Sequence, residues 1–380
     1  MKILLVGEYS RLHNSLQEGL EALDHQCMVI STGDYFKKYP SDILIQRKFD
    51  TGLARKIKIV IYLLFKFDIT SWYITKQFFK NKTALKGFDV VQLINESSFG
   101  ATPKDEKKMV SFLKQHNKKL FLLSCGTDYL SVQHQLSDIN PYSILSNYKE
   151  GKVSKKEFDS ILKYTRAPFK KLHQYVFKNM DGVIASDYDY HMPLKGHKKY
   201  LGLVPNPVNV TKLGFNELHT KSPIVIFMGV NRTNYHSKGI AYFEKALAII
   251  KQKFPKQVHV EIVENIPYGQ YIEKYNHAHI VLDQVFAYDQ GYNALEAMAK
   301  AKVVFTGAET CFMEHYKLKV PVAVNALPDV DYLVLALENL INNPEKIREI
   351  GLAAQDFITQ YHDYKKVAQQ YVDTWQVSKL

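Results

Sequence analysis

The chain has 380 residues, of which 46% are hydrophobic and 23% are charged, and its formal net charge is +12. This length allows two domains of ordinary size, and the composition excludes a disordered chain. The three cysteines, Cys27, Cys125 and Cys311, are widely spaced, which excludes a disulfide framework or a structural zinc site and indicates a reducing, cytoplasmic environment. No stretch reaches the roughly 18 apolar residues of a membrane span.

The first half alternates the patterns of buried strands and of helices. Strands are expected at Lys2–Val6, Cys27–Ser31, Val90–Ile94, Leu120–Ser124 and Asp181–Ser186, and helices at His13–Leu23 and Met109–His116. Such alternation predicts a parallel sheet with helices on both faces.

A segment with two prolines around one asparagine, Val204–Val208, breaks regular structure and marks a linker. A second alternation follows it. Its expected strands are Ile224–Gly229, Val258–Val263, Ile280–Leu282, Val303–Thr306 and Val320–Asn325, and its expected helices are Ala241–Gln252, Tyr268–Asn276, Ala294–Ala299 and Asp356–Trp375. We therefore predict an α/β fold with two Rossmann-like domains.

The most informative motif is Gly291-Tyr292-Asn293-Ala294-Leu295-Glu296-Ala297-Met298-Ala299, which follows the apolar run His279–Asp283 and opens a helix. A glycine at a helix entrance lets the backbone approach a ligand closely. The N–H groups of the first helical turn have no partner within the helix and can bind anionic oxygens. The carboxylate of Glu296 lies further along the helix, where it can accept bonds from sugar hydroxyls. An ordinary β-α unit with a glycine turn remains the structural alternative.

This motif resembles the donor-binding segment of GT-B glycosyltransferases of the GT4-like kind, with the approximate pattern E-x-F-G-x-x-x-x-E-A-M-A-x-G. The match holds at Gly291 and from Glu296 to Ala299, whereas Tyr288 replaces the first family glutamate and Ala301 replaces the later glycine. The resemblance implies the GT-B architecture, with two Rossmann-like domains facing across a cleft. The N-terminal acceptor domain would then comprise residues 1–205, with a helix at about 356–380 packing back on it, and residues 206–355 would form the nucleotide-sugar-binding domain.

The resemblance also implies roles for individual residues on the donor side. Lys238 and Arg232 would bind the diphosphate, because fixed cations stabilise the charge that develops on the leaving phosphate. Glu296 would hold donor hydroxyls. The further residues expected around the donor are Gly7, Gly229, Pro267, Tyr268, Gly291, Tyr292 and Asn293.

Acceptor contacts are expected in the loop that follows the first strand. In the resembled family this loop touches the acceptor, which assigns Glu8, His13 and Asn14 to acceptor binding, although Asn14 can equally cap the helix. Cys125-Gly126-Thr127-Asp128 resembles the family's His-Gly-Ser-Asp, so Asp128 is a catalytic candidate. Cys125 replaces the family histidine, and a buried structural cysteine is the preferred interpretation.

The positive charge lies entirely in the first half. Residues 1–180 contain 29 Lys and Arg against 17 Asp and Glu, whereas residues 181–380 contain 21 of each. This asymmetry predicts an anionic partner, and an anionic membrane surface or phosphorylated lipid acceptor fits better than nucleic acid. As a helix, Thr51–Phe67 places Arg55, Lys58, Tyr62 and Lys66 on one face, which suits either a bilayer surface or a core helix with a solvated stripe.

From these features we expect a retaining, metal-independent hexosyltransferase of bacterial surface-polysaccharide synthesis. It would use a UDP- or GDP-sugar as substrate, with no cofactor and no metal, and would transfer the sugar to a glycan or lipid-linked saccharide. Its expected location is the cytoplasm, with association with the inner face of the membrane left open. A nucleotide-sugar 2-epimerase of the same fold and a non-enzymatic glycan- or membrane-binding module remain alternatives. The lack of a clear carboxylate pair argues against a hydrolase.

Overall fold

The chain folds into two compact α/β units. The computed structural model describes residues 1–34, 39–213 and 223–377, with only the backbone described at Tyr268. The first unit comprises Met1–Gln133, Ile161–Pro207 and the chain from Tyr364 onwards. The second unit comprises His134–Ser160 and Val208–Asp363.

These units differ from the division expected from the sequence. The boundary in the linker lies after Pro207, two residues beyond the predicted position. Residues 134–160, which the prediction placed in the N-terminal domain, belong to the second unit. Sequence patterns cannot assign such a segment, because its partners are distant in the chain.

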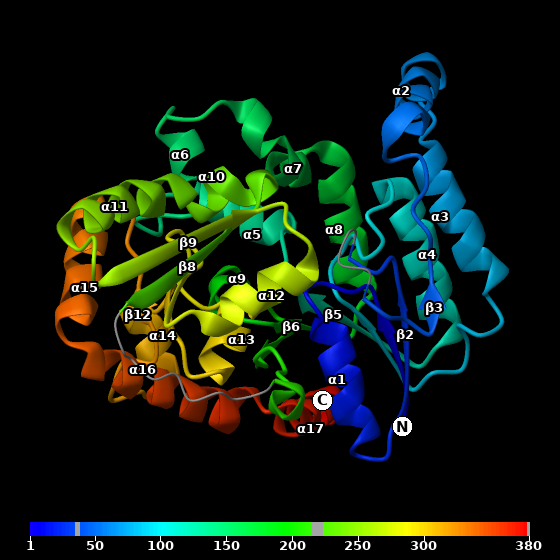
Figure 1. Ribbon diagram of the computed structural model, residues 1–380. Coiled ribbons are helices and arrows are strands. Elements are labelled where there is room, and N and C mark those ends of the chain that lie inside the picture. Colours follow the sequence, from blue (N-terminus) through cyan, green and yellow to red (C-terminus); the bar gives the residue numbers. More distant parts are fainter. Residues whose placement is uncertain (35–38, 214–222, 378–380) are drawn as a thin grey trace. The chain divides into compact units, whose positions relative to one another are not determined.

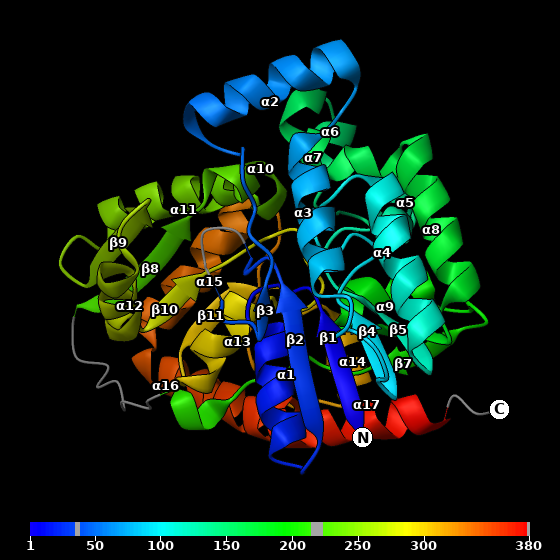
Figure 2. The same cartoon turned by 90° about the vertical axis from the view of Figure 1, so that its right-hand side faces the viewer.

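The first unit contains a seven-stranded sheet in the order β3-β2-β1-β4-β5-β6-β7 (Figure 2). All paired strands are parallel. The strands are β1 (Lys2–Val6), β2 (Gln26–Ser31), β3 (Ile43–Leu44), β4 (Val90–Leu93), β5 (Lys119–Ser124), β6 (Gly182–Ala185) and β7 (Tyr200–Leu203). The strand order reverses between β1 and β4, which is where ligands bind in open α/β sheets.

Helices cover both faces of this sheet. The helices of this unit are α1 (Leu12–Glu21), α2 (Gly52–Phe65), α3 (Ile69–Lys80), α4 (Pro103–His116), α5 (Tyr129–Leu136), α8 (Ala167–Asn179), α9 (Tyr188–Leu194) and α17 (Tyr364–Val377), of which α2 stands away from the sheet (Figures 1 and 2). Alternate strand residues such as Leu4 and Val6 pack into one core with α3, α4 and α8. On the other face α17 packs along α1, and the Trp375 indole donates to Gln92 Oε1 at 3.1 Å.

The second unit has a five-stranded parallel sheet in the order β12-β11-β10-β8-β9 (Figure 1). Its strands are β8 (Ile224–Val230), β9 (Val258–Glu264), β10 (Ile280–Leu282), β11 (Val303–Thr306) and β12 (Val324–Asn325). Its helices are α6 (Ser146–Lys149), α10 (Tyr235–Lys238), α11 (Ile240–Lys253), α12 (Tyr268–His277), α13 (Tyr292–Ala299), α14 (Thr310–His315), α15 (Val330–Asn342) and α16 (Pro344–Phe357). The short α7 (Asp159–Leu162) spans the boundary of the two units.

The predicted α/β fold with two Rossmann-like sheets is confirmed, and two local expectations are wrong. Only Val324–Asn325 of the expected strand Val320–Asn325 pairs with a neighbour. The expected helix Asp356–Trp375 is interrupted at Ile358–His362, a π-helical turn between α16 and α17. The linker explains the interruption, because the Val208 N–H donates to the His362 carbonyl at 2.7 Å and holds the chain there.

Helix α2 has no buried residue. The core-helix interpretation of Thr51–Phe67 is therefore wrong. Within residues 1–34, 39–213 and 223–377, no helix is long and apolar enough to cross a bilayer.

Candidate functional site

The strand order of the second unit reverses between β8 and β10. Ligands of open α/β sheets bind beyond the carboxyl ends of the strands at such a reversal. Asn231 and Arg232 follow β8, Asp283 follows β10, and α13 begins shortly after. The polar residues at this edge are therefore the candidates for binding a ligand.

A buried carboxylate organises this edge of the sheet. Asp283 Oδ1 accepts from Lys238 Nζ at 2.8 Å and from Asn293 Nδ2 at 3.2 Å. Asp283 Oδ2 is also buried, and no described residue donates a hydrogen bond to it. The sequence analysis proposed Lys238 and Asn293 but missed Asp283, whose only signal is its position directly after the strand. The three residues come from separate segments, and the carboxylate connects them.

Gly291, at the start of α13, has open space where a side chain would be. Its φ of −77° is accessible to any residue. A Cβ at this position would have Gln284 Nε2 and Asp283 Oδ2 as its nearest neighbours, at 3.9 and 4.0 Å. Gly291 is the N-cap residue of α13 and has no side chain that could cap the helix. A glycine here leaves room for a ligand to approach the backbone at the start of the helix.

Two tyrosines fix the start of α13. Tyr271 donates to Asn293 Oδ1 and Tyr275 donates to the Asn293 carbonyl, each at 3.0 Å. A Cβ on Gly229 would lie 2.9 Å from the Tyr271 ring, so Gly229 makes room for this tyrosine. Gly229 was expected near the donor, and the structure gives it this packing role. Both tyrosines lie on α12 and were not identified from the sequence.

Arg232 lies on a short 3-10 turn after β8 and forms a forked ion pair with Glu264 at the end of β9. Its Nε lies 2.9 Å from Glu264 Oε1 and its Nη2 lies 2.7 Å from Oε2. The guanidinium lies 5.0 Å from the centre of the Tyr235 ring. The hydrogen bond from Arg232 lowers the pKa of Glu264. The side chain of Arg232 is 57% exposed and that of Glu264 is 31% exposed, so a phosphate can compete for the guanidinium at little cost.

The loop that carries Lys238 is fixed to the loop after β10. The Val285 N–H donates to the Lys238 carbonyl at 3.0 Å, alongside the ion pair to Asp283. The next residue, Gly239, has a φ of +68°, and a Cβ there would overlap Val285 Cγ2. The structure therefore requires glycine at position 239, which explains the Lys-Gly pair.

Apart from Gly7, which follows β1 in the first unit, the other expected donor residues belong to the second unit. Glu296 and Tyr292 are half-buried on α13, and the negative charge of Glu296 opposes the lowering of the Lys300 pKa by burial. Pro267 is exposed and precedes α12. The side chain of Tyr268 lies outside the described part of the chain, so its contact with the donor stays a prediction.

Tyr288, which stands in place of the family's first glutamate, is buried. Its hydroxyl donates to the Tyr142 carbonyl at 3.1 Å, and the two rings stack with their centres 4.9 Å apart. The Tyr142 hydroxyl in turn donates to Glu309. Tyr288 thus attaches the segment 134–160 to the rest of the second unit, although it lies 146 positions from Tyr142 along the chain.

The expected acceptor residues of the first unit support their own loop. The Glu8 carboxylate accepts from the Asn14 N–H at 2.8 Å and so caps α1. His13 is fully buried, with Nδ1 2.7 Å from the Gly7 carbonyl and Nε2 3.3 Å from Gln92 Nε2, and burial lowers its pKa to about 4. A Cβ on Gly7, whose φ is +87°, would overlap Ile94. These contacts give Glu8, His13 and Gly7 structural roles. Contact of Glu8 and His13 with an acceptor, and of Gly7 with the donor, stays a prediction.

Asn14 and Asp128 also have internal partners. Asn14 Nδ2 donates to the Pro40 carbonyl at 2.9 Å. Asp128 accepts from Ser124 Oγ and from the Ser131 N–H, both at 2.7 Å, and thereby caps α5. Burial raises the pKa of the neighbouring Cys125 thiol, which argues against a nucleophilic thiolate.

A buried acid-histidine pair lies at the reversal point of the first sheet and was not predicted as a pair. His173 Nδ1 lies 2.6 Å from Glu96 Oε1, which follows β4. Burial raises the pKa of Glu96 well above its ordinary value and lowers the pKa of His173 to about 4. Both pKa shifts favour a neutral pair, in which one proton is shared between the Glu96 carboxyl and the His173 imidazole. The two residues are 77 positions apart, so no local motif in the sequence indicates that they meet.

Comparisons with known proteins agree with this architecture. A family described as glycosyl transferase-like matches residues 232–373, which include the Lys238, Asp283 and Glu296 positions. No curated protein matches the chain in sequence. Sucrose-phosphate synthase from Thermosynechococcus elongatus is similar in structure at 14% identity with a TM-score of 0.62, over 99% of this chain and 98% of that one.

Two further solved structures are similar to this chain. HepE from Anabaena, in complex with UDP-glucose, is 13% identical with a TM-score of 0.61, over 99% of this chain and 100% of that one. A protein from Listeria monocytogenes described as a UDP-N-acetylglucosamine 2-epimerase is 11% identical with a TM-score of 0.54, over 98% and 94% of the two chains. The chain has the GT-B fold. At these identities the likeness establishes the fold and not the reaction.

Proposed function

We propose that this protein is a retaining glycosyltransferase that transfers a hexose from a UDP- or GDP-sugar to a glycan or lipid-linked saccharide in bacterial surface-polysaccharide synthesis. The observation that carries the proposal is the Lys238–Asp283–Asn293 cluster beside the open entrance of α13. It lies at the strand ends where a nucleotide is expected, within the segment that resembles glycosyl transferases.

In this proposal the diphosphate lies over the N-terminus of α13. An ammonium group has three donors, so Lys238 can keep its bond to Asp283 and still donate to a phosphate oxygen. Arg232 would release Glu264 and bind the same diphosphate. Both cations and the helix terminus would then stabilise the charge on the leaving diphosphate without a metal. Glu296 would accept from donor hydroxyls.

The acid-base chemistry follows from the proposed retention of configuration. The leaving phosphate would take the acceptor proton on the same face of the sugar, so no protein base is needed. Tyr288 supports the rival binding module, because a glutamate at this position in the resembled family is replaced by a residue that packs against Tyr142. The UDP-sugar epimerase neighbour supports the other rival.

One experiment separates the three functions. The purified full-length chain is incubated with a panel of UDP- and GDP-sugars, with and without a lipid-linked saccharide extract, and sugar transfer and donor isomerisation are followed by mass spectrometry and NMR. Transfer that requires acceptor supports the proposal. Isomerised donor without acceptor identifies an epimerase, and binding of donor with neither product supports a binding module.

A further inference from the structure

One face of α2 exposes a continuous apolar stripe. Leu53, Ile57, Val60 and Leu64 follow one another at intervals of four, three and four residues, which places them on the same side of the helix. Their side chains are between 50% and 73% exposed. Scattered exposed apolar residues are common, but a full helical stripe of this kind marks a surface that contacts something else.

Aromatic side chains continue this surface beyond the end of α2. Phe65, Phe67 and Trp72 are 73%, 43% and 45% exposed. Phe67 lies beside Trp72, with ring centres 6.4 Å apart, and Lys76 lies over the Trp72 ring. Tryptophan and phenylalanine rings next to lysines are typical of the boundary between lipid headgroups and acyl chains.

The charges on this segment all have one sign. Residues 51–67 contain four basic residues and no acidic one. Lys58 is paired with Asp50 at 2.9 Å, whereas Arg55, Lys56 and Lys66 are exposed. Helical spacing places Arg55 and Lys56 outside the apolar stripe, and Lys66 directly follows the last residue of α2, so basic flanks accompany the apolar face.

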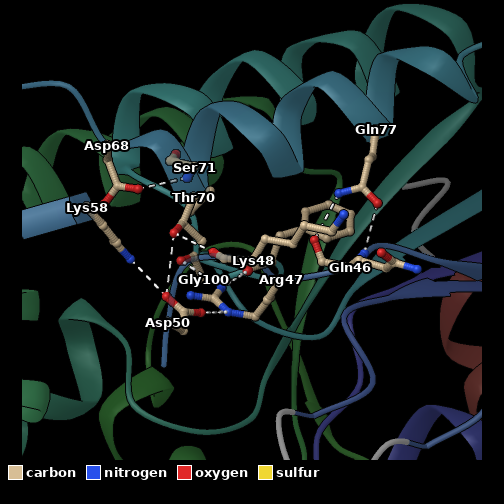
Figure 3. Close-up of polar contacts among 12 residues, drawn as sticks. Gln46, Arg47, Lys48, Asp50, Lys58, Asp68, Thr70, Ser71, Gln77 and Gly100 are labelled. Atoms are coloured by element: carbon tan, nitrogen blue, oxygen red, sulfur yellow. Dashed lines mark hydrogen bonds and ion pairs between the residues drawn. The ribbon is translucent and has the colours of Figure 1, made fainter. Parts of the chain in front are cut away.

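Polar contacts at the root of α2 hold it in place (Figure 3). Asp50 accepts from Arg47 Nε at 3.0 Å, from Lys58 Nζ at 2.9 Å and from Thr70 Oγ1 at 3.5 Å. Arg47 Nη1 also donates to the Phe99 carbonyl at 2.8 Å. These polar contacts attach the root of the helix to its unit, while the apolar stripe stays exposed. Figures 1 and 2 show α2 standing away from the sheet of the first unit, next to α3.

We infer that α2 docks the first unit on an anionic lipid bilayer, with its apolar stripe in the acyl boundary and Arg55, Lys56 and Lys66 at the headgroups. The basic flanks decide against a second copy of this chain as the occupant, because pairing two such stripes would bring like charges together. They also match the excess positive charge of residues 1–180. The docking surface is distinct from the proposed donor site and does not depend on the transfer reaction.

The test is flotation of the full-length protein with vesicles, without any substrate. Vesicles of phosphatidylcholine alone are compared with vesicles that also contain phosphatidylglycerol, over a series of salt concentrations. We expect at least about tenfold tighter binding to the anionic vesicles at low salt, with release as salt rises, because screening shortens the range of the headgroup field.

Two sets of substitutions separate the apolar and basic contributions. The combined variant Leu53→Gln, Ile57→Gln and Val60→Gln should lose binding at every salt concentration. The combined variant Arg55→Gln, Lys56→Gln and Lys66→Gln should lose at least about tenfold in binding at low salt only. Glutamine favours helix, and all these positions are at the surface, so thermal melting should be unchanged.

A matched control removes the same charge elsewhere. The control is the combined variant Lys245→Gln, Lys251→Gln and Lys256→Gln. These lysines lie at exposed positions of the second unit, so their replacement should leave vesicle binding intact. Equal loss in this control would mean that net charge, and not α2, drives binding. Salt-insensitive binding that is equal for both vesicles would overturn the inference. The inference would also be overturned if the protein bound no vesicles, formed a dimer in light scattering, and became a monomer when the apolar residues were replaced.

Discussion

The ammonium of Lys238 lies 2.8 Å from the carboxylate of Asp283, whose side chain is almost wholly buried. This pair connects the loop after β8 to the loop after β10 at the reversal point of the second sheet. The lysine side chain is still 30% exposed, so it can reach a ligand while it neutralises the buried acid. In the proposed function the same side chain both pairs with Asp283 and binds the diphosphate, so a test must separate these two roles.

Lys238→Ala should weaken binding of UDP or GDP much more than binding of the matching nucleoside, because Lys238 is proposed to contact phosphate and not base. The substitution also leaves Asp283 buried without its cation, which should cost about 1–3 kcal/mol of folding free energy. Calorimetry measures the binding and thermal unfolding measures the stability.

The double variant Lys238→Ala with Asp283→Asn is the matched control for this experiment. It removes the uncompensated charge, so stability should recover while diphosphate binding stays weak. Recovery of diphosphate binding in the double variant would give Lys238 a purely structural role.

Glu296→Gln should lower sugar transfer by at least about tenfold with an unchanged melting temperature. The amide loses charge-assisted bonds to sugar hydroxyls, each of which contributes roughly 1.5–3 kcal/mol. The residue is half-buried on α13 and its replacement has nearly the same shape. Steady-state kinetics with the donor found in the panel gives the measurement, and near-normal turnover by the folded variant would falsify the assignment of this motif.

Gly239→Ala should destabilise the protein by at least about 2 kcal/mol. The new Cβ adds backbone strain at a φ of +68° and overlaps Val285. Gly151→Ala is a matched control, because Gly151 has the same φ and no described atom lies within 4 Å of its added Cβ. Denaturant unfolding of both variants separates strain from crowding. Equal losses at the two positions would show that contact with Val285 contributes nothing.

Glu106 should make stability depend on pH. It is buried at the start of α4, and one oxygen accepts from the N–H groups of Ala101 at 2.8 Å and Phe99 at 3.1 Å. Burial raises its pKa from 4.5 to about 7. The folded state thus keeps a proton that the unfolded chain releases, so stability falls as pH rises from about 4.5 to about 7.

Glu106→Gln should remove this dependence, since the amide oxygen keeps accepting and carries no charge. The variant should be more stable than the wild type at pH 8, by up to about 3 kcal/mol, with the difference fading toward pH 4.5. Chemical unfolding across this pH range provides the measurement, with the exposed Glu157→Gln as control. A difference of constant size at every pH would contradict the shifted pKa.

The amino-acid sequence by itself determined the two parallel sheets. Runs such as Ile3–Val6 and Ile224–Met228 are apolar at successive positions, as expected of strands that are covered on both faces. The helix entrance at Gly291 was also visible, since it depends on local backbone geometry. Such features follow from neighbours along the chain, which a sequence displays directly.

Only the tertiary structure decided which side chains meet. Asp283 appeared as the end of an apolar run until the fold placed Lys238 beside it, 45 positions away. Tyr288 was a mismatch to a motif until Tyr142 was found stacked on it. The sequence of α2 was equally compatible with a helix that packs on a core and with a surface helix. Amphipathic spacing shows that one face is apolar, but it does not show what that face contacts. These questions depend on contacts between residues that are far apart in the chain, and such contacts produce no periodic pattern in the sequence.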